Sequence, residues 1–443
     1  MEEPLQLNRK DNRLLFWVFV SVFSFVCVLA KEPVEVYAAY FVFIVLLPVF
    51  IGRYGIPSYF WAFSGLFLFT GVFNIFLDND TFDQFLKIYL GLMMSYLFYY
   101  YVLRRFEFDS ELIFRYYLKA AFIISVIGLI QFFSYIVKFT PGYDFRWLPF
   151  FNKWGVVLGG NLGIRVNSIF GEPSQYAAVM SPAAFIAAYN IVTFKQFVFK
   201  RWQSALVLVV YLLTFSSLGY MGLLLIIFLL MYNFGVARYI FFFVPLIAIT
   251  FVYLYNTVPD FSYRWDSTIL LFQTGEIDIK NEHGSSIVFY NNFVVTMENF
   301  KTNFLFGTGL GSHPVAFEKY SVTKDIQTFG FSNNSSDANS MLLRIISEIG
   351  LIGVILVVTF VSRNFVKRSR HNAHEPYWLI SSALFCIIVL YLLRQGHYFL
   401  NGFPLFVWLY YYNRKRYNAW MERDEDEIEE EAGEEDEITH TSH

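Results

Sequence analysis

A series of long apolar runs constrains this chain more than any other feature. A helix needs about 20 apolar residues to cross a hydrocarbon layer roughly 30 Å thick. The chain is 56% hydrophobic and only 16% charged, whereas a soluble domain is about a quarter charged. We identify twelve apolar runs, at about 14–30, 35–51, 58–77, 84–103, 112–137, 173–194, 202–215, 218–234, 239–256, 339–361, 377–393 and 398–412. The sequence therefore predicts an all-α polytopic membrane protein with about twelve spans.

Two of these runs could instead form one helix. They flank the sequence Ser216-Ser217-Leu218-Gly219, and a single helix across both would be far longer than the bilayer is thick. We therefore expect two helices and a tight turn.

Lysine and arginine in the short connections predict the orientation of the spans. The short connections on one side contain only Lys31 and Arg394, and the other side carries the remaining basic residues of this kind: Arg9, Lys10, Arg13, Arg53, Arg104, Arg105, Lys195, Lys200, Arg201, Arg238, Arg363, Lys367, Arg368, Arg370, Arg414, Lys415 and Arg416. The basic side is expected to be cytosolic. Both termini, including residues 1–13, would then be cytosolic, and the protein would lie in a bacterial inner membrane.

Two predicted extracytoplasmic segments are too long to be turns. The first, at about 139–172, interrupts spans one to nine (14–256), and the second, at 257–338, precedes spans ten to twelve (339–412). Loops of this length are usually functional, so we expect the chemistry there. Within the second loop, residues 287–301 could form a helix at the membrane surface.

The C-terminal segment, 413–443, differs in composition from the rest of the chain. Between Glu422 and Glu437 it holds twelve acidic residues and one arginine, a net charge of −11. Such a run buries too little apolar surface to fold alone. It is predicted to be a disordered cytosolic tail.

The two long loops contain several residues that could carry chemistry. Arg165 and Glu172 lie in one short stretch, and Glu172 precedes Pro173, which suits the first turn of a helix. A helix N-terminus favours an anion, either this carboxylate or a ligand phosphate. Closing the loop structurally is an equally good interpretation of the pair. His313 follows three alternate glycines that permit tight turns and close approach to a ligand, and it is either a surface residue or a base.

Further ionisable residues lie in or near the late spans. Arg344 and Glu348 are four residues apart on one helix face, where a structural ion pair is at least as good an interpretation as substrate contact. Arg394 and His397 flank Gly396 at an outer turn and would suit an anionic ligand or lipid headgroups. Arg264, in the large loop, has the same two interpretations.

Taken together, the outer face offers arginines, a carboxylate and a histidine above an apolar bundle. Arginine forks suit phosphate oxygens, so a lipid-linked diphosphate is the ligand that fits. Cys27 and Cys386 lie in apolar runs without metal-ligand spacing, and no nucleotide-binding glycine motif is found. No metal, cofactor or nucleic-acid partner is predicted.

Four short motifs resemble the O-antigen polymerase and O-antigen ligase family, and the Wzy-type polymerases most. They are residues 165–176, 213–219, 307–311 and 337–353, in the family's order and on its side of the membrane. Family members often carry a histidine beside the asparagine that corresponds to Asn339, where this chain has Ala338 and Ser340. The resemblance covers about residues 110–412.

The resemblance implies a GT-C-like membrane glycosyltransferase that polymerises O-antigen or exopolysaccharide. Its substrate would be an undecaprenyl-diphosphate-linked oligosaccharide, and a chain-length regulator would be a partner. Arg165, with Arg264 and Arg394, would hold the donor diphosphate, and Glu172 or His313 would be the base. Arg344 and His397 would add substrate contacts.

Two other functions stay open from the sequence. A ligase would pass the glycan to lipid A core or to protein, and the motifs barely separate it from a polymerase. A transporter is less well supported, because twelve-span facilitators usually consist of two similar halves and no internal repeat is visible here.

Overall fold

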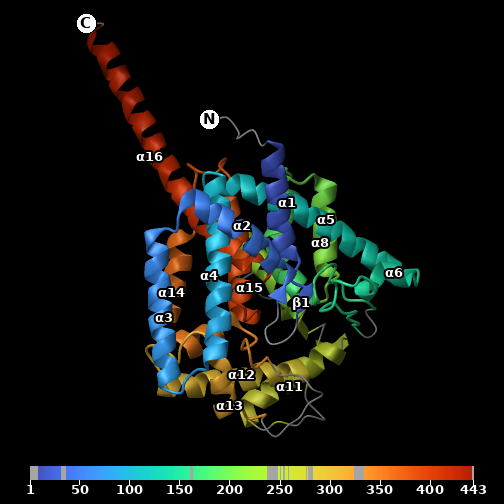
Figure 1. The fold of residues 1–443 in the computed structure, drawn as a ribbon. Coiled ribbons are helices and arrows are strands. Elements are labelled where there is room, and N and C mark those ends of the chain that lie inside the picture. The colour runs from blue at the N-terminus through green and yellow to red at the C-terminus, as the bar shows by residue number, and fades with distance from the viewer. Residues whose placement is uncertain are drawn as a thin grey trace.

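A computed structural model describes residues 8–30, 36–159, 163–236, 248–249, 251–252, 255–257, 259–275, 277, 283–323 and 334–441. It is a bundle of helices with one two-stranded sheet among these residues (Figure 1). Helices occupy eleven of the twelve predicted runs: α1 (Arg9–Phe23), α2 (Ala38–Tyr54), α3 (Ser58–Phe76), α4 (Phe82–Arg105), α5 (Ser110–Ile136), α7 (Pro173–Thr193), α8 (Arg201–Leu212), α9 (Ser217–Asn233), α14 (Met341–Asn364), α15 (Tyr377–Arg394) and α16 (Phe403–Thr441). The run at 239–256 lies mostly outside the described residues.

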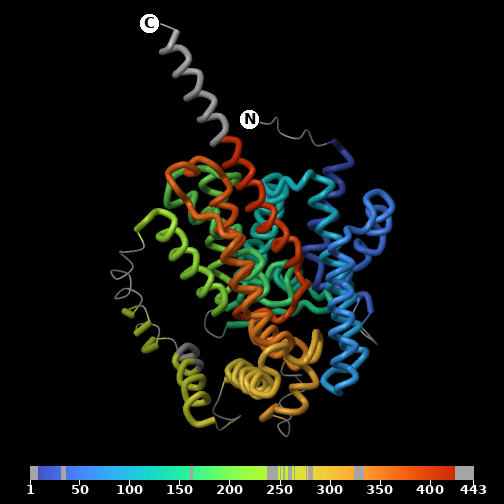
Figure 2. Tube along the Cα trace, turned by 90° about the vertical axis from the view of Figure 1, so that its left-hand side faces the viewer, coloured from blue at the N-terminus to red at the C-terminus, as the bar shows by residue number. Residues whose placement is uncertain are grey.

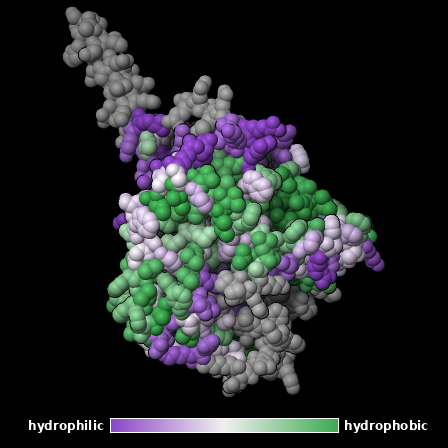
Figure 3. Space-filling view, viewed as in Figure 1, coloured by the Kyte–Doolittle hydropathy of each residue, from purple (hydrophilic) through white to green (hydrophobic). Residues whose placement is uncertain are grey.

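Six of the described helices are long and apolar enough to cross a membrane, namely α3, α4, α5, α7, α14 and α15. Three shorter apolar helices are α2, α8 and α9. A space-filling view shows a broad apolar belt between two polar ends, as a bilayer-spanning bundle would have (Figure 3). The prediction of an all-α protein with several membrane-spanning helices is therefore confirmed, whereas the count of twelve spans stays a prediction.

Helices α7 and α15 form the centre of the bundle. Small residues such as Ala177, Ala178, Ala183 and Ala184 are fully buried along α7, which packs against α8, α9 and α15. Small side chains let helix backbones approach closely, which is the main source of packing energy between helices in a membrane. By contrast, α3 buries only Gly71, packs one face against α4 and exposes apolar side chains over the rest of its surface, as a helix facing lipid would.

The helices of the large predicted loop gather at one end of the bundle, which we call the loop end. They are α11 (Pro259–Thr274), α12 (Gly284–Thr302) and α13 (His313–Tyr320). In both ribbon and tube views they lie opposite the end where α1 begins and α16 leaves the bundle (Figures 1 and 2). Helix α12 confirms the helix predicted over 287–301.

Basic side chains from separate short connections meet at the other end of the bundle. Arg105 forms an ion pair with Asp11 at 2.5 Å, and Arg416 forms one with Asp109 at 2.6 Å. These contacts tie together connections that the sequence predicts to be cytosolic, and the side of the membrane on which they lie stays a prediction.

Two predicted boundaries differ from the structure. The first predicted span, 14–30, ends early: α1 stops at Phe23, and β1 (Val28–Ala30) pairs with β2 (Val36–Tyr37) in an antiparallel hairpin. The side chain of Asn152 accepts from the Val28 amide at 2.9 Å and also donates to its carbonyl, which holds this segment extended.

The last helix also departs from its predicted boundary. Helix α16 continues past 412 into the segment predicted to be disordered. The segment from Asn413 to Asp424 contains neither proline nor glycine, and its chain is held by the Arg416–Asp109 pair and by an ion pair between His371 and Asp424 at 2.7 Å.

The turn between α8 and α9 agrees with the prediction of two helices. Helix α8 ends at Leu212 and α9 begins at Ser217. The Leu213 carbonyl accepts from the Val166 amide at 2.9 Å, so this turn is attached to the first long loop.

Helix α14 is broken at Gly350, whose φ of 69° and ψ of −156° are not helical. The glycine motif at 307–311 docks onto this break. Thr308 and Gly309 donate their amides to the carbonyls of Ser347 at 3.2 Å and Glu348 at 2.8 Å, and Leu351 donates to Phe304 at 2.9 Å. Irregular backbone is tolerated at membrane depth only where protein satisfies its polar groups, and this motif does so.

Candidate functional site

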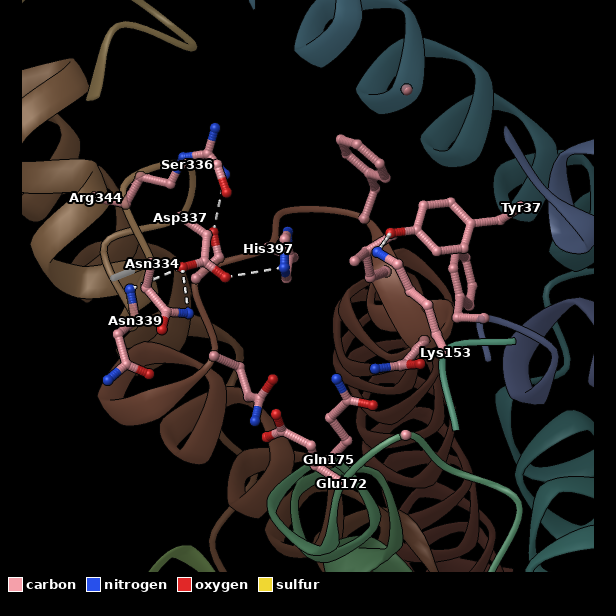
Figure 4. A pocket seen from close by; sticks show the side chains of 18 of the residues that line it. Tyr37, Lys153, Glu172, Gln175, Asn334, Ser336, Asp337, Asn339, Arg344 and His397 are labelled. Carbon is pink, nitrogen blue, oxygen red and sulfur yellow. Dashed lines mark hydrogen bonds and ion pairs between the residues drawn. The ribbon is translucent and has the colours of Figure 1, made fainter. Parts of the chain in front are cut away.

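A cavity of approximately 1400 Å³ opens at the loop end of the bundle (Figure 4). Segments that are far apart in sequence form its walls: the β1–β2 hairpin, the first half of α4, residues 171–175, the start of α12, residues 334–339 and residues 394–401. Pockets for small ligands reach about 1,000 Å³, so this cavity has room for a larger molecule.

One wall of the cavity carries a histidine–aspartate pair, which we call the dyad. His397 Nε2 lies 2.9 Å from Asp337 Oδ2, while the other oxygen of Asp337 accepts from the Asn339 amide and the Asn334 side chain, each at 3.0 Å. Burial alone would raise the pKa of Asp337, but the nearby His397 and these donors lower it below its ordinary value. The carboxylate therefore stays ionised and fixes the orientation of the imidazole ring.

The backbone of the turn that carries His397 is fixed by contacts with Asp337 and Arg344. A side chain at Gly396 would overlap the carbonyl oxygen of Asp337, so only glycine fits there. Arg344 donates to the Gly396 carbonyl at 3.0 Å and to Glu348 at 2.8 Å, and Tyr398 donates to the other oxygen of Glu348 at 2.9 Å. The predicted ion pair of α14 is thus formed, and both side chains are almost fully buried although Arg344 also borders the cavity.

Tyr37 and Lys153 line the cavity across from Asp337, and Glu172 and Gln175 line its lower edge in the view of Figure 4. Glu172 is the N-cap residue of α7, with Pro173 in the first helical turn, as the sequence predicts. Its carboxylate accepts from the Ser174 hydroxyl at 3.1 Å. The Lys153 ammonium lies 3.0 Å from the Tyr37 hydroxyl, in an arrangement that also places it over the Tyr37 ring.

Two more cations and an apolar surface complete the lining. Lys87 projects from α4, and Arg394 lies over the Phe289 ring with its guanidinium 5.2 Å from the ring centre. The apolar part comes from the hairpin, α4 and the segment before α16, through Phe25, Leu86, Leu90, Met94 and Phe399. The cavity therefore combines positive charge, carboxylates and an apolar surface.

The structure brings four of the seven predicted site residues to this cavity, namely Glu172, Arg344, Arg394 and His397. Arg165 is not among its lining residues; its Nε donates to the Thr214 carbonyl at 3.3 Å and ties the first loop to the α8–α9 turn. Arg264 lies in α11, but its side chain is outside the described part of the structure.

His313 is fully buried and is not among the residues that line the cavity. Its Nε2 lies 3.0 Å from the Asn292 side-chain oxygen, and its Nδ1 lies 3.4 Å from the Ser347 hydroxyl. Burial, and then the positive charge of Arg344, lower the pKa of His313 to about 3. A group with so low a pKa accepts a proton poorly near neutral pH, so this geometry does not support His313 as the base.

Several lining residues have no signal in the sequence taken alone. Asp337 lies within a family-like motif, but only the fold shows that it pairs with a histidine 60 positions later. Lys153 belongs to a segment without a motif, and Tyr37 lies at the start of the predicted span 35–51, where nothing in the sequence singles it out. Of these residues, Asp337 comes closest to having a sequence signal, because it stands two residues before Asn339 and the family often carries a histidine beside that asparagine.

Comparison with models of known protein families finds no match, and comparison with curated protein sequences finds none either. Among the described residues, no group of histidine, cysteine and acidic side chains is arranged to hold a metal ion.

Proposed function

We propose that this protein is a membrane glycosyltransferase that joins oligosaccharide repeat units carried on undecaprenyl diphosphate, in the manner of a Wzy-type polymerase. The observation that carries the proposal is the composition of one large cavity. It places cations, carboxylates and an apolar surface together at the end of an apolar bundle. A lipid-linked diphosphate needs all three: cations for its charge, polar groups for its sugars and an apolar surface for its lipid.

The leaving diphosphate is assigned to the cations of the cavity. Arg394 offers a planar fork for phosphate oxygens, and Lys87 adds a point charge. His397, oriented by Asp337, is a further hydrogen-bond donor on the same wall as Arg394. Stabilising charge on a departing group by preorganised donors is commonly the largest contribution to such catalysis.

Glu172 is assigned as the base that acts on the acceptor. The oxygen of an acceptor hydroxyl attacks the anomeric carbon of the donor sugar and gives up its proton to the Glu172 carboxylate. The bond from that carbon to the diphosphate oxygen breaks, and the diphosphate leaves with the bonding electrons. Arg344 supports the turn of His397 instead of contacting the diphosphate, because it is buried in its pair with Glu348.

The same proposal places the protein in a bacterial inner membrane, with both termini cytosolic and the loop end in the periplasm. A ligase is the alternative with a closely related site. The two differ in the acceptor, since a polymerase lengthens the chain when lipid-linked repeat units are the only substrate.

The test uses the full chain in lipid nanodiscs with undecaprenyl-diphosphate-linked repeat units alone. We expect a ladder of longer products. Arg394→Ala should slow elongation about a hundredfold, the usual loss when one donor to a developing charge is removed. Lys138→Ala is the matched control, because Lys138 is an exposed basic residue just before the first long loop that does not line the cavity. A wild-type protein that makes no ladder from these units, but transfers glycan to lipid A core, would show that it is a ligase.

A further inference from the structure

We propose that Tyr37, Lys153, Glu172 and Gln175 form a separate carbohydrate subsite, which binds the acceptor sugar while the donor diphosphate lies on the wall of Arg394 and His397. This inference rests on the proposed function, since it divides one cavity between two substrates. We call these four residues the acceptor wall.

The acceptor wall is held in place by backbone contacts. The Lys153 amide donates to the Val26 carbonyl at 3.1 Å, and the neighbouring Asn152 side chain binds Val28. The first long loop is therefore attached to the β1–β2 hairpin. On its other side the Lys153 carbonyl packs against Gly171, where an added Cβ would lie only 2.9 Å from it. The first long loop, the start of α7 and the hairpin thus present their side chains from one preformed surface.

The chemistry of this wall suits a sugar better than a diphosphate. A sugar hydroxyl both donates and accepts, and the wall offers an ammonium donor, a carboxylate acceptor, an amide that does both and a phenol. The positive charge of Lys153 is opposed by the negative charge of Glu172 on the same wall. A diphosphate carries several negative charges and would meet that carboxylate, whereas a neutral polyol would not be repelled.

The assignment to the acceptor follows from the base. A general base must contact the hydroxyl whose proton it takes, and Glu172 belongs to this wall. In Figure 4, Tyr37 and Lys153 lie across the cavity from Asp337, and Glu172 and Gln175 lie at its lower edge between the two sides. A displacement requires the nucleophile and the leaving group on opposite sides of the reacting carbon, so the leaving diphosphate belongs with the dyad.

Two binding probes test this division in nanodiscs with the full chain. One is a lipid-free oligosaccharide of a single repeat unit, released from the polysaccharide of the producing cell, and the other is undecaprenyl diphosphate without sugar. Lys153→Ala should raise the Kd of the oligosaccharide about tenfold or more, the effect of about 1.4 kcal/mol, and change that of the diphosphate less than twofold. Arg394→Ala should show the reverse pattern.

Gln175→Ala is the second variant, since it leaves the hairpin contacts of Lys153 intact, and Lys138→Ala is again the control. Equal losses for both probes would overturn the division, as would a wild-type protein that does not bind the oligosaccharide. The wild type could bind both probes, and the two variants could show the crossed losses, while the wild type fails to lengthen the glycan chain. In that case the subsite stands and the polymerase function is wrong.

Discussion

Removing one member of the buried Arg344–Glu348 pair should destabilise the protein much more than removing one member of an exposed ion pair. Both side chains are almost fully buried, and Arg344 Nε lies 2.8 Å from Glu348 Oε1. Arg344→Leu would leave the Glu348 carboxylate buried, with the Tyr398 hydroxyl still donating to it but no positive charge beside it. Breaking such a pair costs about 3–5 kcal/mol because one charge remains uncompensated.

Removing both partners should recover much of that loss. Arg344→Leu/Glu348→Leu removes both charges of this pair, although the Gly396 carbonyl and the Tyr398 hydroxyl each lose a partner, at about 1–3 kcal/mol apiece when buried. The double variant should therefore be destabilised by clearly less than the sum of the single ones, and the coupling energy should be about 3 kcal/mol.

The assay is reversible unfolding in nanodiscs, followed by tryptophan fluorescence. Arg115 and Glu111 provide a matched control, because they form the same i,i+4 pair at 2.5 Å but are substantially exposed. Arg115→Leu should change the free energy of unfolding by about 1 kcal/mol or less. If Arg344→Leu costs no more than Arg115→Leu, or if the losses of the two single changes simply add, the argument from burial is refuted.

Three further predictions follow from the fold. Gly350→Ala should lower the free energy of unfolding by about 2–4 kcal/mol, because Gly350 has a positive φ and an added Cβ would lie 2.7 Å from the backbone nitrogen of Gly307. Gly52→Ala is the control in the same unfolding assay, since a Cβ there meets nothing within 4 Å. The lowered pKa of His313 keeps its imidazole neutral in the folded protein, whereas the unfolded chain takes up a proton there below about pH 6.5. The free energy of unfolding should therefore fall by about 1.4 kcal/mol per pH unit below 6.5, and His313→Gln should remove that slope between pH 6.5 and 5. Alkaline-phosphatase fusions at Ser285 should be active and those at Asn413 inactive; the reverse would invert the topology.

The helices could be predicted closely because a span is a local property of the sequence. Helix α7 was expected at 173–194 and occupies Pro173–Thr193, with a proline at its start that fixes the boundary. The end of α1 could not be predicted in this way. Residues after Phe23 remain apolar, but Asn152 binds the backbone of Val28 from more than a hundred residues away. Hydropathy alone does not record such a contact.

The candidate site could likewise be predicted only where a residue's position follows from the local sequence. Glu172, Arg394 and His397 were expected on one face because they lie at the outer ends of spans, and they do share a cavity. Asp337 and Lys153 were missed because their roles depend on partners brought close only by the fold. Arg165 was the strongest sequence candidate, yet its guanidinium binds the Thr214 carbonyl of a turn that the sequence could not place next to it.

The glycine motif shows most clearly how a correct pattern can lead to a wrong partner. Glycines at 307, 309 and 311 were expected to let backbone approach a ligand closely, and their φ values of 64°, 100° and 98° do favour glycine. At Gly307 the close approach is instead to α14, whose break at Gly350 needs partners for its exposed backbone groups, while Gly309 and Gly311 approach Asn74 of α3 and Gln84 of α4. The glycine motif and Gly350 are therefore two halves of one structural device. Because the carbonyl of Glu348 accepts from Gly309 while its side chain holds Arg344, and Arg344 holds the turn of His397, this device also fixes one wall of the cavity.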